Sequence, residues 1–256
     1  MMIMIFSVSA IASLIGAAFV GLSASKDNKI LRKTALSVIK DINNTADKVI
    51  ALNKWVYCNQ GFKKNSGYYL LKRLEATPMQ IYQDGGDCAD KSRLLSVMLD
   101  EIGIRSSLVM LYSSQNSNPV HTVVYAWHES GVMAVDPVFD IDFPDEKGCY
   151  LPVQSLIADD CVLTDRISEL CCERGEIDKI NYYNVATHHY RFATTFNWNK
   201  NFLTRITASL MSAIGIDPAT LPRPRLFEDP KLAITAAFTS LGIFFAISAI
   251  LIAGLG

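Results

Sequence analysis

The sequence has no excess of one charge sign, no paired-cysteine motif and no internal repeat. It contains 24 Lys and Arg against 25 Asp and Glu, and this net charge of −1 gives no reason to expect a nucleic-acid partner. None of the six cysteines forms a Cys-x-x-Cys pair, and a chain of 256 residues buries enough core to fold without a disulfide framework. The cysteines stand at positions 58, 88, 149, 161, 171 and 172. Composition therefore leaves the redox compartment open.

Metal-ligand spacing is also missing. The adjacent cysteines Cys171 and Cys172 are poor zinc ligands as a pair, and His188-His189 has no carboxylate or cysteine at a suitable distance along the chain. Such a histidine pair is more typical of a surface or core position. We therefore expect no metal and no cofactor.

Charge is absent from two long stretches, one at each end. Residues 2–22 and 232–255 carry no charged side chain, and each is long enough to cross a bilayer as a helix. For the first stretch a cleaved signal peptide is the alternative, because the small residues Ser23-Ala24-Ser25 follow it. Against this alternative, the run is long and no Lys or Arg precedes it. The second stretch is the stronger membrane prediction.

These runs divide the chain into five predicted parts. We expect an N-terminal transmembrane helix or signal anchor (1–24), a catalytic core (25–140), an extension of the soluble domain (141–216), a proline-rich linker (217–231) and a C-terminal transmembrane helix (232–256). The extension includes a polar helix near 163–175 and an aromatic-rich stretch at 181–199, which is more typical of packing than of a substrate cleft.

The core is organised around Gly85-Gly86-Asp87-Cys88 and the apolar run after it. Apolar residues recur at helical spacing to Ile102, Asp87 is a good N-cap, and Gly103 is a good stop. The spacing predicts a helix over about 88–102 with Cys88 in its first turn. The free N–H groups and the positive dipole end there favour a thiolate, so Cys88 is a candidate nucleophile. We expect the two glycines to keep bulk away from the sulfur.

After this helix the pattern changes to strands. Residues 121–127 and 132–136 predict a hairpin across the turn His128-Glu129-Ser130-Gly131. If this turn is regular, Trp127 pairs with Val132, and His121 and Asp136 are diagonal neighbours on one face. A thiol, an imidazole that takes its proton and a carboxylate that orients the imidazole form the set used in nucleophilic acyl transfer.

The chain resembles the transglutaminase-like superfamily, whose fold is related to that of papain. The resemblance covers about residues 45–140, and the matching motifs are Gly86-Asp87-Cys88-Ala89-Asp90, Gly103-Ile104, His121-Thr122-Val123-Val124, Ala134-Val135-Asp136-Pro137 and Pro78-Met79-Gln80. It implies an α+β fold with a nucleophile helix on an antiparallel sheet, and a bacterial, membrane-anchored member of the family. It also implies Cys88 as nucleophile, His121 as general base and acid, and Asp136 as orienter.

An acyl-transfer site needs donors for the oxyanion. The backbone N–H of Cys88 is the first choice and the side chain of Gln80 the second, with Gln83 and Tyr82 as alternatives to Gln80. A solvated loop glutamine is an equally good interpretation of Gln80.

We therefore expect a membrane-anchored cysteine peptidase or amidase that acts on a protein or peptide through a thioester. A transamidase is the alternative within this chemistry. A non-catalytic binding or assembly subunit of a membrane complex is the alternative outside it. The basic residues Lys26, Lys29, Arg223 and Arg225 flank the two apolar runs on the side of the soluble domain. They favour a cytoplasmic domain at an inner membrane, with a periplasmic domain as the alternative.

Overall fold

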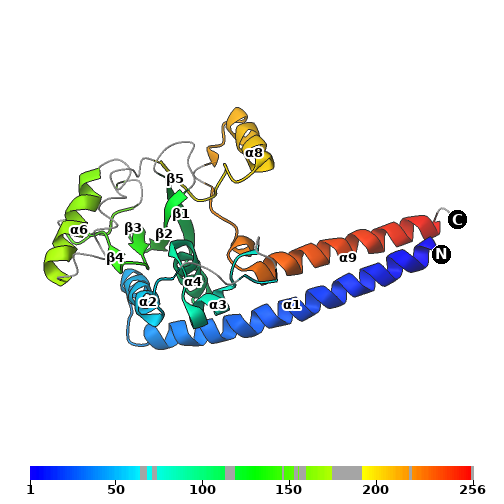
Figure 1. Ribbon diagram of the computed structural model, residues 1–256, viewed down its shortest axis with the longest axis horizontal. Coiled ribbons are helices and arrows are strands. Elements are labelled where there is room, and N and C mark those ends of the chain that lie inside the picture. Colours follow the sequence, from blue (N-terminus) through cyan, green and yellow to red (C-terminus); the bar gives the residue numbers. More distant parts are fainter. Residues whose placement is uncertain are drawn as a thin grey trace.

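The computed structural model describes residues 1–63, 68–70, 74–112, 119–145, 147–152, 155, 160–174, 192–218 and 221–254. These residues form a mixed helix and antiparallel sheet domain, from which two long apolar helices project (Figure 1). Most of the aromatic-rich stretch and the pair His188-His189 lie outside the described residues.

The two projecting helices are α1 (Met2–Val38) and α9 (Pro230–Gly254), and both are long and apolar enough to span a membrane. They run side by side with the two chain termini at the same end (Figure 1). Small residues let them approach: a Cβ added at Gly242 would lie 2.8 Å from the Leu14 side chain. Helix α1 continues without a break past Ser23-Ala24-Ser25 and into the domain. The predicted boundary at residue 24 thus falls inside one helix.

Helices α1 and α9 run antiparallel and are called the α1–α9 hairpin below. A polar contact marks the level at which this hairpin leaves the domain. The Nζ atom of Lys231 donates to Ser23 Oγ at 2.9 Å and to Asp27 Oδ2 at 2.5 Å. Beyond this level both helices expose large apolar side chains, such as Phe19 and Phe244. The contact therefore links α1 to α9 at the point where the surface changes from charged to apolar.

Three shorter helices lie against the domain end of α1. These are α2 (Thr45–Asn59), α3 (Pro78–Asp84) and α4 (Cys88–Glu101). The predicted nucleophile helix is confirmed in type and extent, with Asp87 as its N-cap. Its C-terminal turn is closed by the Ile104 N–H donating to Leu99 O and the Gly103 N–H donating to Asp100 O.

The sheet has five strands in the order β4-β3-β2-β1-β5, all antiparallel to their neighbours. The strands are β1 (Ser106–Tyr112), β2 (Pro119–His128), β3 (Gly131–Asp136), β4 (Ile141–Asp142) and β5 (Phe192–Thr194). The predicted pairing of Trp127 with Val132 is confirmed, and the ladder reaches His128 opposite Gly131. The loop is thus two residues rather than four, and the register is unchanged because both lengths keep the same parity.

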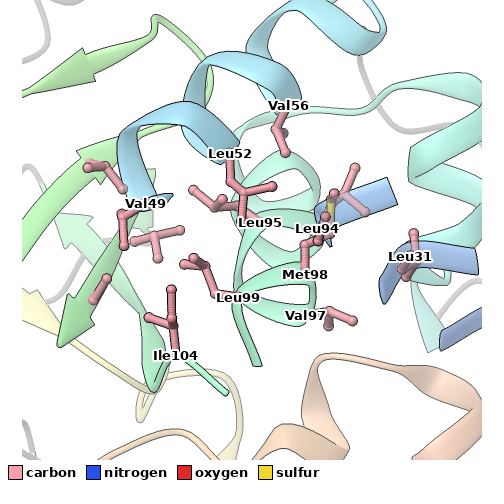
Figure 2. Close-up of a cluster of buried hydrophobic side chains, with 14 of the residues drawn as sticks. Leu31, Val49, Leu52, Val56, Leu94, Leu95, Val97, Met98, Leu99 and Ile104 are labelled. Atoms are coloured by element: carbon pink, nitrogen blue, oxygen red, sulfur yellow. The ribbon is translucent and has the colours of Figure 1, made fainter. Parts of the chain in front are cut away.

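Both faces of the sheet are covered. Val124 and Val135 point into a core formed with α1, α2 and α4, where Leu52, Leu95 and Leu99 pack together (Figure 2). On the other face, the buried Val123, Ala134 and Phe143 pack with Leu170 of α6 (Asp160–Arg174). Ten consecutive residues of α4, from Asp90 to Leu99, are buried. Helix α4 is therefore the centre of the domain and holds its N-terminus in a defined place.

The chain returns to α9 through helix α8 (Phe202–Ala213) and the short helix η3 (Arg225–Phe227). The predicted linker is attached to the domain at two points. The Arg223 N–H donates to Ser107 Oγ at 3.3 Å, and the Arg225 guanidinium pairs with Asp100 and Glu101 of α4. The start of α9 is thereby connected to the nucleophile helix through η3.

Candidate active site

The start of α4 is built by a capping box and two glycines. The Asp87 carboxylate accepts the N–H groups of Ala89 and Asp90, at 3.0 and 3.1 Å, and the Asp90 carboxylate accepts the Asp87 N–H. Position 86 requires a glycine because a Cβ at this position would lie only 2.4 Å from the Cβ of Asp90. Gly85 has a φ of +79°, and a Cβ there would lie 2.5 Å from the Gly61 oxygen. The glycines therefore make room for the cap and the neighbouring backbone, rather than for the sulfur as predicted.

His121 and Asp136 meet just beyond the end of the β2–β3 ladder. The last paired residues are Val124 and Val135, and past them the Nε2 atom of His121 lies 2.6 Å from Asp136 Oδ2. The other carboxylate oxygen of Asp136 accepts the Val138 N–H at 2.8 Å. Asp136 is fully buried and His121 is 3 % exposed. The carboxylate is thus held by the backbone and holds the imidazole in turn.

The Cys88 thiol completes the group. It makes a side-chain hydrogen bond with the His121 ring, and the six cysteines, all described, are free of disulfides. Burial by itself would lower the pKa of His121. The Asp136 carboxylate, followed by Cys88, outweighs burial and raises the pKa of His121 to about 10. At neutral pH the ring of His121 is therefore protonated.

Helix α4 is fixed to the sheet one turn after Cys88. The buried hydroxyl of Ser92 donates to the Thr122 carbonyl oxygen at 2.9 Å, next to His121 in the chain. Residues four apart lie on one helix face, so this bond sets how far Cys88 stands from β2. Sequence reasoning missed Ser92. The only signal was a polar residue four places after Cys88, on the same helix face.

Lys91 ties the same turn of α4 to the end of α2. Its Nζ atom donates to the carbonyl oxygens of Val56, Tyr57 and Gln60, at 2.6 to 3.0 Å, where α2 has unpaired acceptors. Burial lowers the pKa of Lys91 to about 8, although Cys58 and Asp136 partly offset it. Burial likewise raises the pKa of Asp90 to about 6, against the nearby Arg93.

Gln80 lies in the first turn of α3, ahead of the site. Its Oε1 atom accepts the Thr77 N–H at 2.9 Å, and its own N–H donates to Thr77 Oγ1 at 3.2 Å, which together cap α3. The carbonyl end of the side chain is thus used locally. An oxyanion role for its amide nitrogen stays a prediction.

Among the residues that the structure describes, no three His, Cys, Asp or Glu side chains gather in a way that would hold a metal ion. The chemistry of this site is that of a thiol, an imidazole and a carboxylate.

Two solved structures resemble part of the chain. A "putative cysteine protease" from Cytophaga hutchinsonii is 20 % identical, with a TM-score of 0.36 over 43 % of this chain and 37 % of its own. A "putative protease" from Parabacteroides distasonis is 14 % identical, with a TM-score of 0.34 over 55 % of this chain and 30 % of its own. The chain thus spans only about a third of the length of these two proteins. No protein-family model and no curated protein matches the chain.

Proposed function

We propose that the chain is a membrane-anchored cysteine hydrolase of the transglutaminase-like type, a peptidase or amidase. The observation that carries this proposal is the position of His121, which contacts Cys88 on one side and Asp136 on the other. Three residues from three separate elements meet in a mostly buried place, and they are the types that nucleophilic acyl transfer requires. Cys88 is half-buried, whereas His121 and Asp136 are almost fully shielded from solvent.

In the acylation step the Cys88 sulfur attacks the carbonyl carbon of a peptide bond or a glutamine side chain. Nε2 of His121 is hydrogen-bonded to Asp136. We therefore assign the transfer of the proton between the Cys88 thiol and His121 to the other ring nitrogen, Nδ1. The raised pKa of His121 means that the ring carries this proton at neutral pH. It passes the proton to the leaving nitrogen as the carbon–nitrogen bond breaks, which leaves a thioester on Cys88 and releases an amine.

In the deacylation step His121 removes a proton from water, which attacks the thioester and releases the acid and the thiol. The oxyanion formed in each step requires hydrogen-bond donors. The Asp87 cap uses the N–H groups of Ala89 and Asp90 but not that of Cys88, which supports the Cys88 N–H as the first donor. Transamidation differs only in that an amine replaces water, and the described residues include no feature that selects one.

The hairpin of α1 and α9 supports the membrane part of the proposal. Large apolar side chains cover its outer surface, among them Ile15, Phe19, Ile243 and Ile250, each at least half exposed. A soluble protein rarely exposes an apolar surface of this length, whereas lipid covers it without cost. The packing of α9 along α1 also favours an uncleaved first helix, because cleavage after Ala24 would remove most of the helix surface on which α9 packs.

For the side of the membrane we propose the cytoplasm. Lys26, Lys29, Arg32 and Lys33 are exposed on α1 just past the level at which the hairpin begins, and basic residues near membrane helices favour that side. A reducing compartment also suits six free thiols. A reporter that is active only in the cytoplasm, fused within residues 113–118, would contradict this placement if it stayed inactive.

The proposed chemistry is tested with a thiol-reactive acyl electrophile on the full chain in detergent. We expect the probe to label Cys88 and the Cys88→Ala variant to remain unlabelled at that peptide, and peptide fragments released from a proteome digest to identify the substrate class. A matched control is Cys58→Ala, which removes a more exposed thiol. If Cys88→Ala is folded and fully active in the cell, the chain is a binding or assembly subunit that keeps the fold.

A further inference from the structure

Helix α8 is amphipathic, but its apolar face is exposed, whereas the apolar face of a helix in a soluble domain is normally buried. Most of its large apolar residues are exposed and lie on one side: Phe202 at 67 %, Leu203 at 73 %, Ile206 at 39 %, Leu210 at 63 %, and Ile214 just past its end at 74 %. The half-buried positions belong to Thr204, Ala208 and Met211, on the other side. No residue of α8 is buried. The helix thus has one less exposed face, and it presents most of its large apolar side chains on the opposite, exposed face.

Contacts of the segments that flank α8 connect them to the residues just before α9. The ring of Phe196, before α8, lies 5.4 Å from the ring of Phe227 in η3, and Trp198 Nε1 donates to the Pro218 oxygen at 3.1 Å. Phe227 comes only three residues before α9 begins at Pro230. Along the long axis of the molecule, α8 accordingly lies at the level where α9 starts (Figure 1).

The outward face of α8 is uncharged, and the charged side chains near it lie at its edge. Arg205 is the single charged residue of the helix, and Lys200 precedes it. Leu226 and Phe227 of η3 add exposed apolar surface between α8 and the hairpin. The apolar surface of the hairpin is thus continued sideways on the domain, at the height where lipid headgroups meet the protein.

We propose that α8 lies in the surface of the same bilayer that holds the α1–α9 hairpin, with its large apolar face in lipid. An interfacial helix of this kind inserts about 5–10 Å into the boundary between headgroups and acyl chains. It would give the domain a third contact with the membrane and keep it from rotating about the hairpin. This inference rests on the membrane anchoring proposed above, but not on the chemistry of Cys88.

The test uses the full chain reconstituted in vesicles of phosphatidylcholine and phosphatidylglycerol. The photoreactive residue p-benzoylphenylalanine replaces Leu210 on the outward face, Ser212 on the other side of α8, or Ile243 on the hairpin. All three positions are exposed, so the replacements are not expected to disturb the fold. Circular dichroism checks the fold of each variant, and Ile214 is a second position on the outward face.

We expect lipid adducts at Leu210 and Ile214, several-fold above those at Ser212, and strong adducts at Ile243. If Ile243 reacts with lipid while Leu210 and Ile214 react no more than Ser212, α8 is not at the membrane and the anchoring stands. Crosslinks from Leu210 to a protein chain in place of lipid would also overturn the inference. If Ile243 fails as well, the hairpin itself is outside the bilayer, and both membrane proposals are wrong.

Discussion

Helix α4 and the α1–α9 hairpin contain the same kinds of apolar residue and place them in opposite ways. In α4, leucines such as Leu95 and Leu99 have no exposed surface, and the polar Lys91 and Ser92 are buried beside them with hydrogen-bond partners. In the hairpin, large apolar side chains point outward and small ones such as Ala17 lie between the helices. The difference follows from what surrounds each region: protein on every side of α4, and lipid, as we propose, around the hairpin.

This comparison also explains why the candidate catalytic residues lie at α4 and not in the hairpin. A buried polar group costs free energy unless it is hydrogen-bonded. In α4 and its neighbours the partners are Thr122, the Val138 N–H and three carbonyl oxygens at the C-terminal end of α2. The paired groups fix Cys88 and His121 in place. The hairpin has one such contact, Lys231 with Ser23 and Asp27, at its end. The domain thus holds polar side chains in fixed positions, and the hairpin presents a mostly apolar surface.

The largest expected effect tests the polar interior around α4. Cys88→Ala or His121→Ala should lower turnover by about 10⁵-fold or more, and Asp136→Asn by roughly 10- to 100-fold less, because the asparagine still accepts the Val138 N–H. Residues that act as a unit are not additive, so the double variant should be little worse than either severe single one. Turnover is measured on the substrate identified by labelling. Independent, multiplying losses would contradict a shared mechanism.

The next prediction compares one apolar side chain from each region. Leu95→Ala empties a fully buried site and should lower the free energy of unfolding by about 2–5 kcal/mol. Ile243→Ala removes a side chain that is 53 % exposed, and should cost less than about 1 kcal/mol. Denaturant unfolding of both variants in detergent gives the two values. Equal losses would mean that the outer face of the hairpin is packed against protein.

The next prediction compares the alkylation rate of Cys88, at the start of α4, with the rates of two exposed cysteines. Cys58 and Cys149 are exposed and Cys88 is half-buried, so accessibility alone predicts that Cys88 is the slowest of the three. We expect the reverse near neutral pH, by about tenfold or more, because Cys88 stands at a helix N-terminus beside a protonated imidazole. Iodoacetamide labelling followed by peptide mass mapping measures the rates. His121→Ala should remove the advantage of Cys88, and an unchanged rate in that variant would exclude His121 as its partner.

The last prediction concerns the dependence of stability on pH. The pKa of His121 is raised from 6.5 to about 10, so its protonated form stabilises the fold fully below about pH 6.5, and this contribution is lost as the pH rises through 10. The pKa of Lys91 is lowered to about 8, which acts in the opposite sense over part of this range. The quantity to measure is therefore the difference in unfolding free energy between the native chain and His121→Gln. We expect it to shrink between pH 7 and 10, and a constant difference would contradict the raised pKa.

Much of the candidate site could be predicted because its signals are local. Asp87 caps the helix three residues before Asp90, and the parity of a short hairpin loop decides which residues of β2 and β3 face each other. Both depend only on near neighbours in the chain. The contact between Cys88 and His121 is different, because it joins elements 33 positions apart, and it was expected from the family resemblance rather than from spacing.

The sequence by itself determined the helix starts and stops, the hairpin register and the two apolar runs, since each depends on hydrogen bonds or hydropathy within a few residues. Only the tertiary structure decided that α1 runs unbroken from the hairpin into the core, that Gly86 makes room for Asp90, and that Ser92 is bonded to Thr122. It also decided that the large apolar side chains on one face of α8 are exposed. The physical reason is that burial and pairing depend on which distant segments arrive at a side chain, and a one-dimensional pattern does not contain that information.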